Sequence, residues 1–295
     1  MLAFLPGPIR GVIAYILYFI NTGLWGTLIV VFGVFKFLIP IEGWVKILDK
    51  LLNWFATNWI FVNSFIMRLP NKITWDISGV KDLNYDGWYL VISNHKSWVD
   101  ILVLAKAFYR KIPFFKFFMK KELIWVPFVG IGCWSLDFPF MKRYSREFLE
   151  KHPHLKGKDV EITKKACEKY KKNPVAILNF VEGTRFTKEK HRKQQSPFKH
   201  LLKPKAGGIA FVLETMGEQL QNILNVTITY PKGVRGFWGF CCGEISEIRV
   251  KVEEIPVKNE MIGDYANDPD FKKQFQSWLN DVWVEKDNQI DQLLS

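Results

Sequence analysis

Residues 88–100 read W-Y-L-V-I-S-N-H-K-S-W-V-D, and this stretch decides the fold. The apolar run Trp88–Ser93 predicts a buried strand, and the pattern from Trp98 to Tyr109 predicts an amphipathic helix. A strand that passes into a helix through a short polar loop is the unit from which α/β proteins are built. The loop residues Asn94–Ser97 lie where such folds place active groups.

The same alternation of strands and helices continues along the chain. The predicted strands are Asn71–Ser78, Trp88–Ser93, Pro113–Met119, Pro174–Val181, Leu224–Tyr230 and Ile245–Val252, and further helices are predicted at Asp159–Lys172, Gly207–Gly217 and Pro269–Leu294. Strands separated by helices favour an α/β fold with a mixed, largely parallel sheet flanked by helices.

Two apolar segments precede this pattern. No charged residue occurs from Gly11 to Phe35, and a helix of about 25 residues is roughly 37 Å long, enough to cross a bilayer. The second segment, Leu51–Met67, is shorter and carries aromatic side chains of the interfacial kind. We predict membrane-anchoring helices over residues 1–70, as a hairpin or as one span plus an in-plane helix, and an α/β domain over residues 71–295. The alternative is that both segments are buried core helices.

Composition narrows the class of partner. The chain of 295 residues has a formal net charge of +12, which suits a nucleic acid, an anionic membrane or an acidic soluble partner. Aromatic residues make up 16% of the chain and, with the apolar N-terminal segments, favour a membrane over a nucleic acid. The basic stretches Arg110–Lys121 and Lys188–Lys205 are either solvated faces or surfaces for anionic headgroups or an acidic donor. The four cysteines contain no C-x-x-C pair, so no metal site is predicted.

His95 is the first candidate for chemistry, because an imidazole can accept a proton near neutral pH. Asp100 lies five residues further on, and the two side chains can meet if His95 is in the loop and Asp100 in the first helical turn. Asp100 would then orient the imidazole as a general base. Ser97-x-x-Asp100 is also a helix-capping pattern, so Asp100 can equally serve the start of the helix alone.

Residues 180–185, F-V-E-G-T-R, form a second polar group, which follows another predicted strand. Gly183 lets the backbone approach a ligand, Thr184 adds a hydroxyl, and Arg185 offers a planar fork for phosphate oxygens. Glu182 can accept a hydrogen bond from a ligand hydroxyl or hold the arginine. The alternative is an ordinary polar turn with a surface arginine. A candidate base, His95, thus follows one strand, and a candidate phosphate-binding group, Arg185, follows another. Together they indicate an acceptor that carries a hydroxyl and a phosphate.

The motifs N-H-K-S-W-V-D and F-V-E-G-T-R resemble the H-x-x-x-x-D and E-G-T-R hallmarks of the glycerolipid acyltransferases, the family of the 1-acyl-glycerol-3-phosphate (lysophosphatidate) acyltransferases. The resemblance covers roughly residues 85–235. Two further stretches, C-W-S-L-D-F-P-F-M-K-R-Y-S-R and the C-terminal F-x-x-W-L-N-D-V-W-x-E-K-D, resemble the bacterial YihG-type acyltransferases of the inner membrane over nearly the whole chain. It implies that His95 deprotonates the acceptor hydroxyl and that Asp100 orients His95. It also implies a set of residues that hold the phosphate and glycerol of the acceptor: Glu182, Gly183, Thr184, Arg185, Lys205 and one of Lys142 and Arg143.

The resemblance further implies the transfer of a fatty acyl group from acyl-carrier protein or acyl-coenzyme A to the free hydroxyl of a lysophospholipid. The expected acceptor is 1-acyl-glycerol 3-phosphate and the product is phosphatidate, with another lysophospholipid, such as lysophosphatidylglycerol, as the alternative. No cofactor is expected, because the thioester donor is already activated. We expect the domain on the cytoplasmic face of the inner membrane. A non-catalytic membrane-binding protein of the same fold is the remaining alternative.

Overall fold

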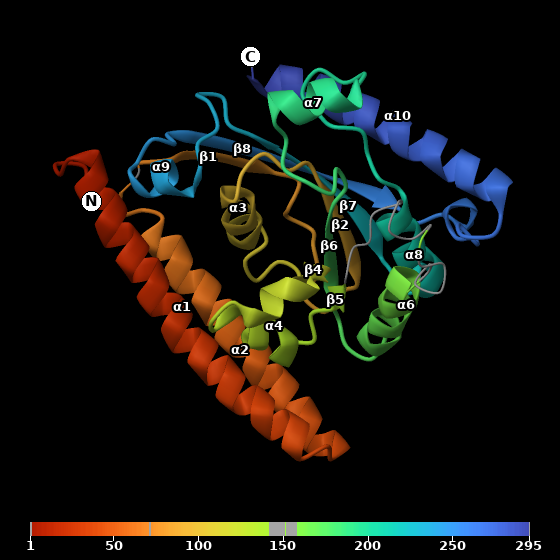
Figure 1. Cartoon of the computed structure of the whole chain (residues 1–295), viewed down its shortest axis with the longest axis horizontal. Coiled ribbons are helices and arrows are strands. Elements are labelled where there is room, and N and C mark those ends of the chain that lie inside the picture. Colours follow the sequence, from red (N-terminus) through yellow and green to blue (C-terminus); the bar gives the residue numbers. More distant parts are fainter. Residues whose placement is uncertain (1, 71, 142–150, 152–157, 295) are drawn as a thin grey trace.

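A helical hairpin and an α/β domain make up the computed structural model, which describes residues 2–70, 72–141, 151 and 158–294 (Figure 1). The hairpin consists of α1 (Gly7–Leu38) and α2 (Glu42–Ile66). The domain contains, in order, β1 (Thr74–Ser78), β2 (Tyr89–Ser93), α3 (Val99–Ala107), β3 (Phe115–Phe117), β4 (Met119–Lys120), η1 (Lys121–Trp125), α4 (Val129–Ser135), β5 (Phe140–Met141), α6 (Lys158–Tyr170), β6 (Ala176–Phe180), α7 (Lys188–Gln194), α8 (Gly207–Met216), β7 (Asn222–Thr229), α9 (Phe237–Cys241), β8 (Glu247–Pro256), η3 (Asn259–Met261) and α10 (Pro269–Leu294).

The main sheet has the strand order β1-β8-β7-β2-β6-β3. Neighbouring strands in it run parallel, except that β7 and β8 pair antiparallel. Helices cover both of its faces (Figure 1). The prediction of a mixed, largely parallel sheet flanked by helices is therefore confirmed.

The residues of β2 show why this strand reads as an unbroken apolar run. Tyr89 and Val91 belong to the core under α1, α2 and α3, whereas Leu90 and Ile92 belong to the core under α6, α8 and α10. Successive side chains of a strand point to opposite faces, so a strand covered on both sides needs apolar residues at every position. This double burial places the end of β2 at the centre of the domain.

One predicted strand differs from the structure, and the short helix α7 has no counterpart among the predicted elements. The run Pro113–Met119, predicted as one strand, forms β3 and part of β4, which belong to different sheets. The basic stretch Lys188–Lys205 contains the short helix α7, whose start is capped by Thr187 Oγ1, which accepts the Lys190 N–H at 3.2 Å. Seven residues make only two helical turns, too few for a periodicity to appear in the sequence.

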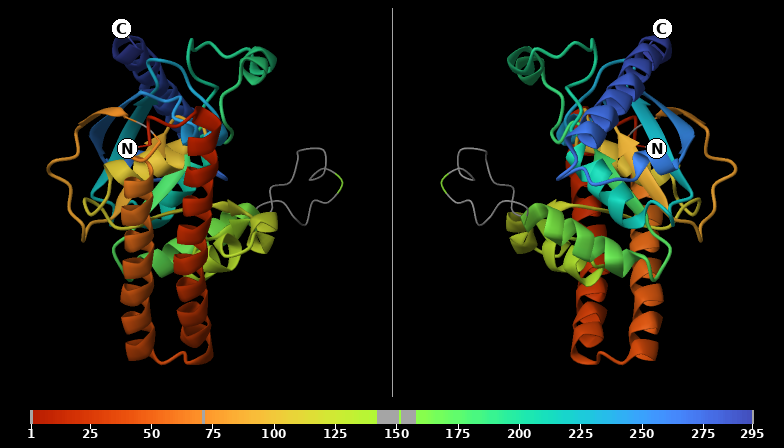
Figure 2. Two further views of the ribbon diagram at one scale, coloured as in Figure 1. Left: turned by 90° about the vertical axis from the view of Figure 1, so that its left-hand side faces the viewer. Right: turned by 90° about the vertical axis from the view of Figure 1, so that its right-hand side faces the viewer.

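Of the two predicted arrangements for the N-terminal segments, the structure has the hairpin, which projects beyond the α/β domain (Figure 2). Asn21 Nδ2 donates to Asn63 Oδ1 at 2.8 Å between the two helices. Within the described part of the chain, α1 is the helix that is long and apolar enough to cross a membrane. Side chains such as Ile16, Phe19 and Val31 are exposed along it, so α1 is not a buried core helix.

Helix α4 packs against α1 where glycine residues leave room for it. A Cβ at Gly33 would stand 2.1 Å from Ser135 Oγ, and one at Gly26 would stand 2.8 Å from Phe128 Cβ. These distances are shorter than any van der Waals contact, so a larger residue at either position would push the two helices apart. The hairpin is thus attached closely to the domain along α1.

Candidate active site

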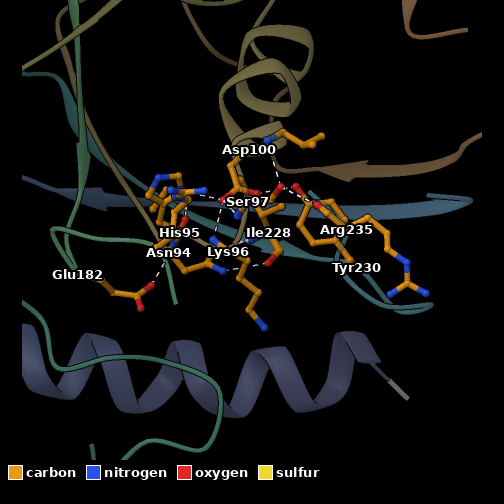
Figure 3. A network of polar contacts seen from close by, with 12 residues as sticks. Asn94, His95, Lys96, Ser97, Asp100, Glu182, Ile228, Tyr230 and Arg235 are labelled. Atoms are coloured by element: carbon orange, nitrogen blue, oxygen red, sulfur yellow. Dashed lines mark hydrogen bonds and ion pairs between the residues drawn. The ribbon is translucent and has the colours of Figure 1, made fainter. Parts of the chain in front are cut away.

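His95 lies in the loop between β2 and α3, at the carboxyl end of a central strand. Asn94 fixes the start of this loop against β7 (Figure 3). Its Nδ2 donates to Ile228 O at 2.9 Å, and its Oδ1 accepts the Ile228 N–H at 2.9 Å. A side-chain amide therefore extends the pairing of β2 with β7 by one residue.

The imidazole of His95 is paired with Asp100, as Figure 3 shows. Nδ1 of His95 lies 2.8 Å from Oδ2 of Asp100. A carboxylate has no proton to donate, so Nδ1 carries the hydrogen and Nε2 is left as a proton acceptor. The ring also stacks on Phe180, with the two centroids 3.9 Å apart. This arrangement of His95 is the one that a general base requires.

Asp100 is fully buried and serves both the histidine and the loop. Its Oδ2 also accepts the N–H of Lys96 at 2.6 Å and the N–H of Ser97 at 2.8 Å. Its Oδ1 accepts the hydroxyl of Tyr230. The sequence leaves open whether Asp100 contacts His95 or the start of the helix. The same carboxylate makes both kinds of contact.

Tyr230 is a site residue that sequence reasoning does not find. It lies 130 positions beyond Asp100, directly after the last residue of β7. Burial raises the pKa of Tyr230 well above its usual value, and the charge of Asp100 adds to this rise. The phenol therefore stays protonated and donates a hydrogen bond to Asp100. The one sequence signal for Tyr230 is a polar aromatic residue at the end of an apolar strand.

The carboxylate of Glu182 is buried and points at two backbone groups. Oε1 accepts the His95 N–H at 3.0 Å, and Oε2 accepts the Leu202 N–H at 2.9 Å. Glu182 therefore joins the His95 loop to the loop before α8, and its role in holding an acceptor stays a prediction from sequence. Burial raises the pKa of Glu182 to about 7, although the two N–H donors act in the opposite direction. In this geometry Glu182 is a positioning residue.

Glu182→Gln is expected to lower the free energy of unfolding by about 1–3 kcal/mol, because the new amide NH₂ faces a backbone N–H. Burial raises the pKa of Glu182 to about 7, above the ordinary value of a glutamate, so the folded protein holds this proton more tightly than the unfolded chain does. The stability that this proton contributes is complete below the unfolded pKa and is lost as the pH rises through the folded one. Denaturant unfolding should thus give a larger difference between wild type and variant at about pH 5.5 than at about pH 8. A difference that grows toward the higher pH contradicts this assignment.

The E-G-T-R turn brings several predicted residues together. Gly183 has a φ of +68°, in the left-handed region that favours glycine, and a Cβ there would stand 3.0 Å from Lys205 Nζ. Lys205 also donates its N–H to Val181 O at 2.9 Å. Lys205, which the family resemblance also implies for the acceptor, thus lies beside the turn. The hydroxyl of Thr184 faces α7, because Thr184 Oγ1 accepts from Lys190 Nζ at 2.7 Å.

The two motifs, whose residues His95 and Glu182 are 87 positions apart, meet at one edge of the sheet. Phe186 donates its N–H to His95 O at 2.7 Å. Arg185 is exposed and lies over the ring of Trp98, with Cζ 4.6 Å from the ring centroid. Trp98 immediately precedes α3, so this stack places the guanidinium beside the loop of His95. The one sequence signal for Trp98 is a large aromatic residue at the first position of the predicted amphipathic helix.

Lys142 and Arg143 lie outside the described residues, so their roles stay predictions from sequence. Among the residues that the structure describes, no group of three or more His, Cys, Asp or Glu side chains is arranged to hold a metal ion.

Comparison with protein families shows where this constellation belongs. A family model described as Acyltransferase matches residues 75–229, which is more than half of the chain and includes both motifs. The chain belongs to the acyltransferase family.

The relatives of this acyltransferase-family chain are distant. It is 26% identical over 226 residues to 1-acyl-sn-glycerol-3-phosphate acyltransferase 3 of Arabidopsis thaliana, with 68% of the chain and 52% of the relative covered. It is 22% identical over 255 residues to the 2-acyl-1-lysophosphatidylinositol acyltransferase of Saccharomyces cerevisiae, with 70% and 61% covered. The chain thus spans between about half and three-fifths of the length of these relatives.

The crystal structure of the 1-acyl-sn-glycerophosphate (LPA) acyltransferase PlsC from Thermotoga maritima has the same fold as this chain. The TM-score is 0.53 at 18% sequence identity, and the match covers 94% of both chains. The match extends over the hairpin as well as the domain, because it covers nearly all of the chain.

Proposed function

We propose that this chain transfers a fatty acyl group from a thioester donor, acyl-carrier protein or acyl-coenzyme A, to the free hydroxyl of a lysophospholipid. The observation that carries the proposal is the 2.8 Å contact between His95 Nδ1 and Asp100 Oδ2, at the edge of the sheet that also holds Arg185. A base and an anion-binding group in one site suit an acceptor with a hydroxyl and a phosphate. Membership of the acyltransferase family supports the same class of reaction.

The mechanism that we propose has His95 as its base. Nε2 of His95 takes the proton of the acceptor hydroxyl while the hydroxyl oxygen bonds to the carbonyl carbon of the thioester. Asp100 stabilises the imidazolium that forms. The tetrahedral intermediate then breaks its C–S bond, and the leaving thiolate takes the proton from His95 to become a thiol. The base is neutral again, and no co-reactant beyond donor and acceptor is consumed.

The first acceptor that we propose is 1-acyl-glycerol 3-phosphate, which gives phosphatidate as the product. The exposed fork of Arg185 suits a phosphate group, and Lys205 adds an ammonium beside the same turn. One of Lys142 and Arg143 is proposed as a further phosphate contact, on the strength of the family resemblance alone. The relative in Arabidopsis thaliana is named for this acceptor.

A lysophospholipid with a larger headgroup, such as lysophosphatidylglycerol, is the second candidate. Arg185 and Trp98 are both exposed, so a substituent on the far side of the phosphate can extend into solvent without displacing a buried side chain. The relative in Saccharomyces cerevisiae is named for a lysophosphatidylinositol acceptor. Assays with several acceptors separate the two candidates.

We also propose that the hairpin holds the chain at the cytoplasmic membrane, with the α/β domain on the cytoplasmic side. The exposed apolar side chains of α1 support this proposal, as do the exposed rings of Trp125 and Trp134 near α4. The net charge of +12 would draw the chain toward anionic headgroups. The proposed acceptor and product are themselves lipids of such a membrane.

Arg185→Ala is expected to lower kcat/KM for 1-acyl-glycerol 3-phosphate by roughly 10- to 100-fold, mainly through KM, because hydrogen bonds to a charged group are worth about 1.5–3 kcal/mol. The measurement is the initial rate of transfer from a labelled acyl donor to lysophosphatidate, lysophosphatidylglycerol and monoacylglycerol. Monoacylglycerol has no phosphate, so its use should change little in the variant.

Arg192→Ala is the matched control, because it removes one exposed positive charge from α7 without touching Trp98. Arg185→Lys keeps the charge but lacks the planar fork, so partial recovery is expected. An Arg185→Ala variant that uses every acceptor at the wild-type rate would remove the phosphate clamp from the proposal. A wild-type protein that transfers to none of the acceptors would refute the reaction itself.

A further inference from the structure

A cavity of about 950 Å³ lies at the amino ends of the strands, whereas His95 follows the carboxyl end of β2. Its walls come from α2 and from Tyr85, Pro113 and Pro174, which precede β2, β3 and β6. β2 runs from this end of the sheet to His95, and its five residues separate the two places by roughly 17 Å. The cavity is therefore distinct from the candidate active site.

The lining of this cavity combines an apolar wall with an excess of positive charge. Leu52, Trp54, Phe114 and Leu136 form the apolar part. Four acidic side chains also line it, against six basic ones: Lys46, Lys50, Arg110, Lys116, Lys169 and Lys172. A space with these properties suits a molecule that has a hydrocarbon part and a negative charge.

The inner acidic groups of the cavity are already paired within the protein. Lys36 Nζ lies 2.6 Å from Asp49 Oδ1 and 2.6 Å from Asp137 Oδ2. Lys169 forms an ion pair with the other oxygen of Asp137. These ion pairs offset part of the negative charge that faces the cavity.

Lys116 also lines the cavity, and it takes no part in the ion pairs of Lys36 and Lys169. It comes from the middle of β3, and its Nζ lies 4.9 Å from the ring centroid of Tyr170, which also lines the cavity. In the part of the chain that the structure describes, no carboxylate oxygen lies within 4.0 Å of this ammonium. Burial lowers the pKa of Lys116 to about 8, while the charge of Asp137 opposes this shift, so the amine is mostly charged near neutral pH. Lys116 is half-buried, so its ammonium is only partly hydrated, and an anion beside it would offset the cost of that partial desolvation.

We propose that this cavity binds an anionic amphiphile, with its phosphate or carboxylate beside Lys116 and its hydrocarbon chain along Leu52, Trp54 and Phe114. A free inorganic anion would pair with the lysine but leave the apolar wall in water, so an amphiphile fits both parts of the lining. The occupant would contact α2 of the hairpin and β3 of the domain together. It would therefore stabilise the attachment of the hairpin to the domain, in proportion to its concentration relative to its Kd. The site does not depend on the proposed transfer reaction.

Photo-crosslinking of the full chain tests the proposal. Three probes with a diazirine in the acyl chain, a phosphatidate, a free fatty acid and a diacylglycerol, are offered in phosphatidylcholine vesicles, and crosslinked peptides are mapped by mass spectrometry. Wild type is expected to show crosslinks near Leu52 and Phe114 with an anionic probe and not with diacylglycerol. Lys116→Met should lower this labelling by roughly 10-fold, the effect of losing one charge-assisted contact.

Lys120→Met is the matched control, because Lys120 is exposed, lies four positions further on and does not line the cavity. Lys116→Arg keeps the charge and should keep the labelling. If Lys116→Met is poorly folded, the rise in Tm that phosphatidate or fatty acid produces is compared between wild type and Lys116→Arg, and equal rises are expected.

Labelling by one anionic probe alone supports the site and identifies its headgroup. Three results overturn the proposal: no crosslink at the cavity in wild type, equal labelling of wild type and folded Lys116→Met, or equal labelling by the neutral probe. Crosslinks near His95 map to different peptides. A wild-type protein that is labelled at the cavity but transfers no acyl group thus contradicts the proposed reaction and not this site.

Discussion

His95→Ala is expected to lower kcat for acyl transfer by roughly 10²- to 10⁴-fold, the range typical of a single general base. The ring of His95 is held from two sides, by Asp100 at 2.8 Å and by the stacked ring of Phe180 at a centroid distance of 3.9 Å. Alanine removes the proton acceptor Nε2 and leaves the contact of Arg185 with Trp98 in place. KM for the acceptor should thus change much less than kcat. Initial rates with a labelled acyl donor and lysophosphatidate measure both constants.

The control for this variant removes a histidine elsewhere. His200 pairs with Asp291 of α10 at 2.7 Å, and His200→Ala is expected to leave kcat unchanged. Circular dichroism and the unfolding midpoint show whether His95→Ala is folded. A folded His95→Ala variant with the wild-type kcat would exclude His95 as the base. If the chain is instead a non-catalytic membrane-binding protein of this fold, wild type itself will show no turnover.

Asp100→Asn is expected to lower kcat by a similar factor, on the order of 10²- to 10⁴-fold, with the loop largely preserved. The amide oxygen of asparagine can take the place of Oδ2 and accept the N–H groups of Lys96 and Ser97, which now lie at 2.6 and 2.8 Å. It carries no negative charge, however, and cannot stabilise the imidazolium of His95. The loss should therefore appear in kcat, measured at saturating donor and acceptor. Retention of the wild-type kcat would show that the carboxylate serves only the start of the helix.

A double-mutant cycle with Tyr230 sharpens this second prediction. The hydroxyl of Tyr230 donates to Oδ1 of Asp100, so its effect on catalysis passes through that carboxylate. Tyr230→Phe should lower kcat by roughly 5- to 10-fold, which corresponds to about 1 kcal/mol for one hydrogen bond. The same substitution in the Asp100→Asn protein should have a smaller effect, because the charge that it supports is absent. Equal factors in both backgrounds would mean that Tyr230 only fills space.

The parts of this protein that could be predicted from sequence are those that depend on local patterns. The apolar run Trp88–Ser93 needs two covered faces, and a strand with two covered faces belongs to a sheet with helices on both sides. His95 and Asp100 are five positions apart, so one loop and one helical turn bring them to the observed 2.8 Å. Neither of these two inferences requires knowledge of how distant segments of the chain pack.

The contacts that could not be predicted join distant segments. Glu182 binds the backbone of His95 and Leu202, and its burial depends on how the loop before α8 crosses the E-G-T-R turn. A glutamate in a polar turn is usually exposed to solvent, where it is accessible to a ligand. The residue type alone therefore gives no sign that Glu182 is buried. The approach of Tyr230 to Asp100 and of Arg185 to Trp98 likewise depends on tertiary packing and leaves no periodic signal.

The amide of Asn94 binds both backbone groups of Ile228, and this has a consequence for affinity. A segment that is ordered only when its ligand arrives loses conformational entropy at that moment, and this loss weakens binding. Here Asn94 ties the backbone before His95 to β7, and Asp100 accepts the N–H groups of Lys96 and Ser97 after it, so the loop is held by the protein's own contacts. In the proposed reaction, an entering lysophospholipid therefore finds the imidazole of His95 already oriented by Asp100, and the free energy of its headgroup contacts goes into affinity and not into ordering the loop.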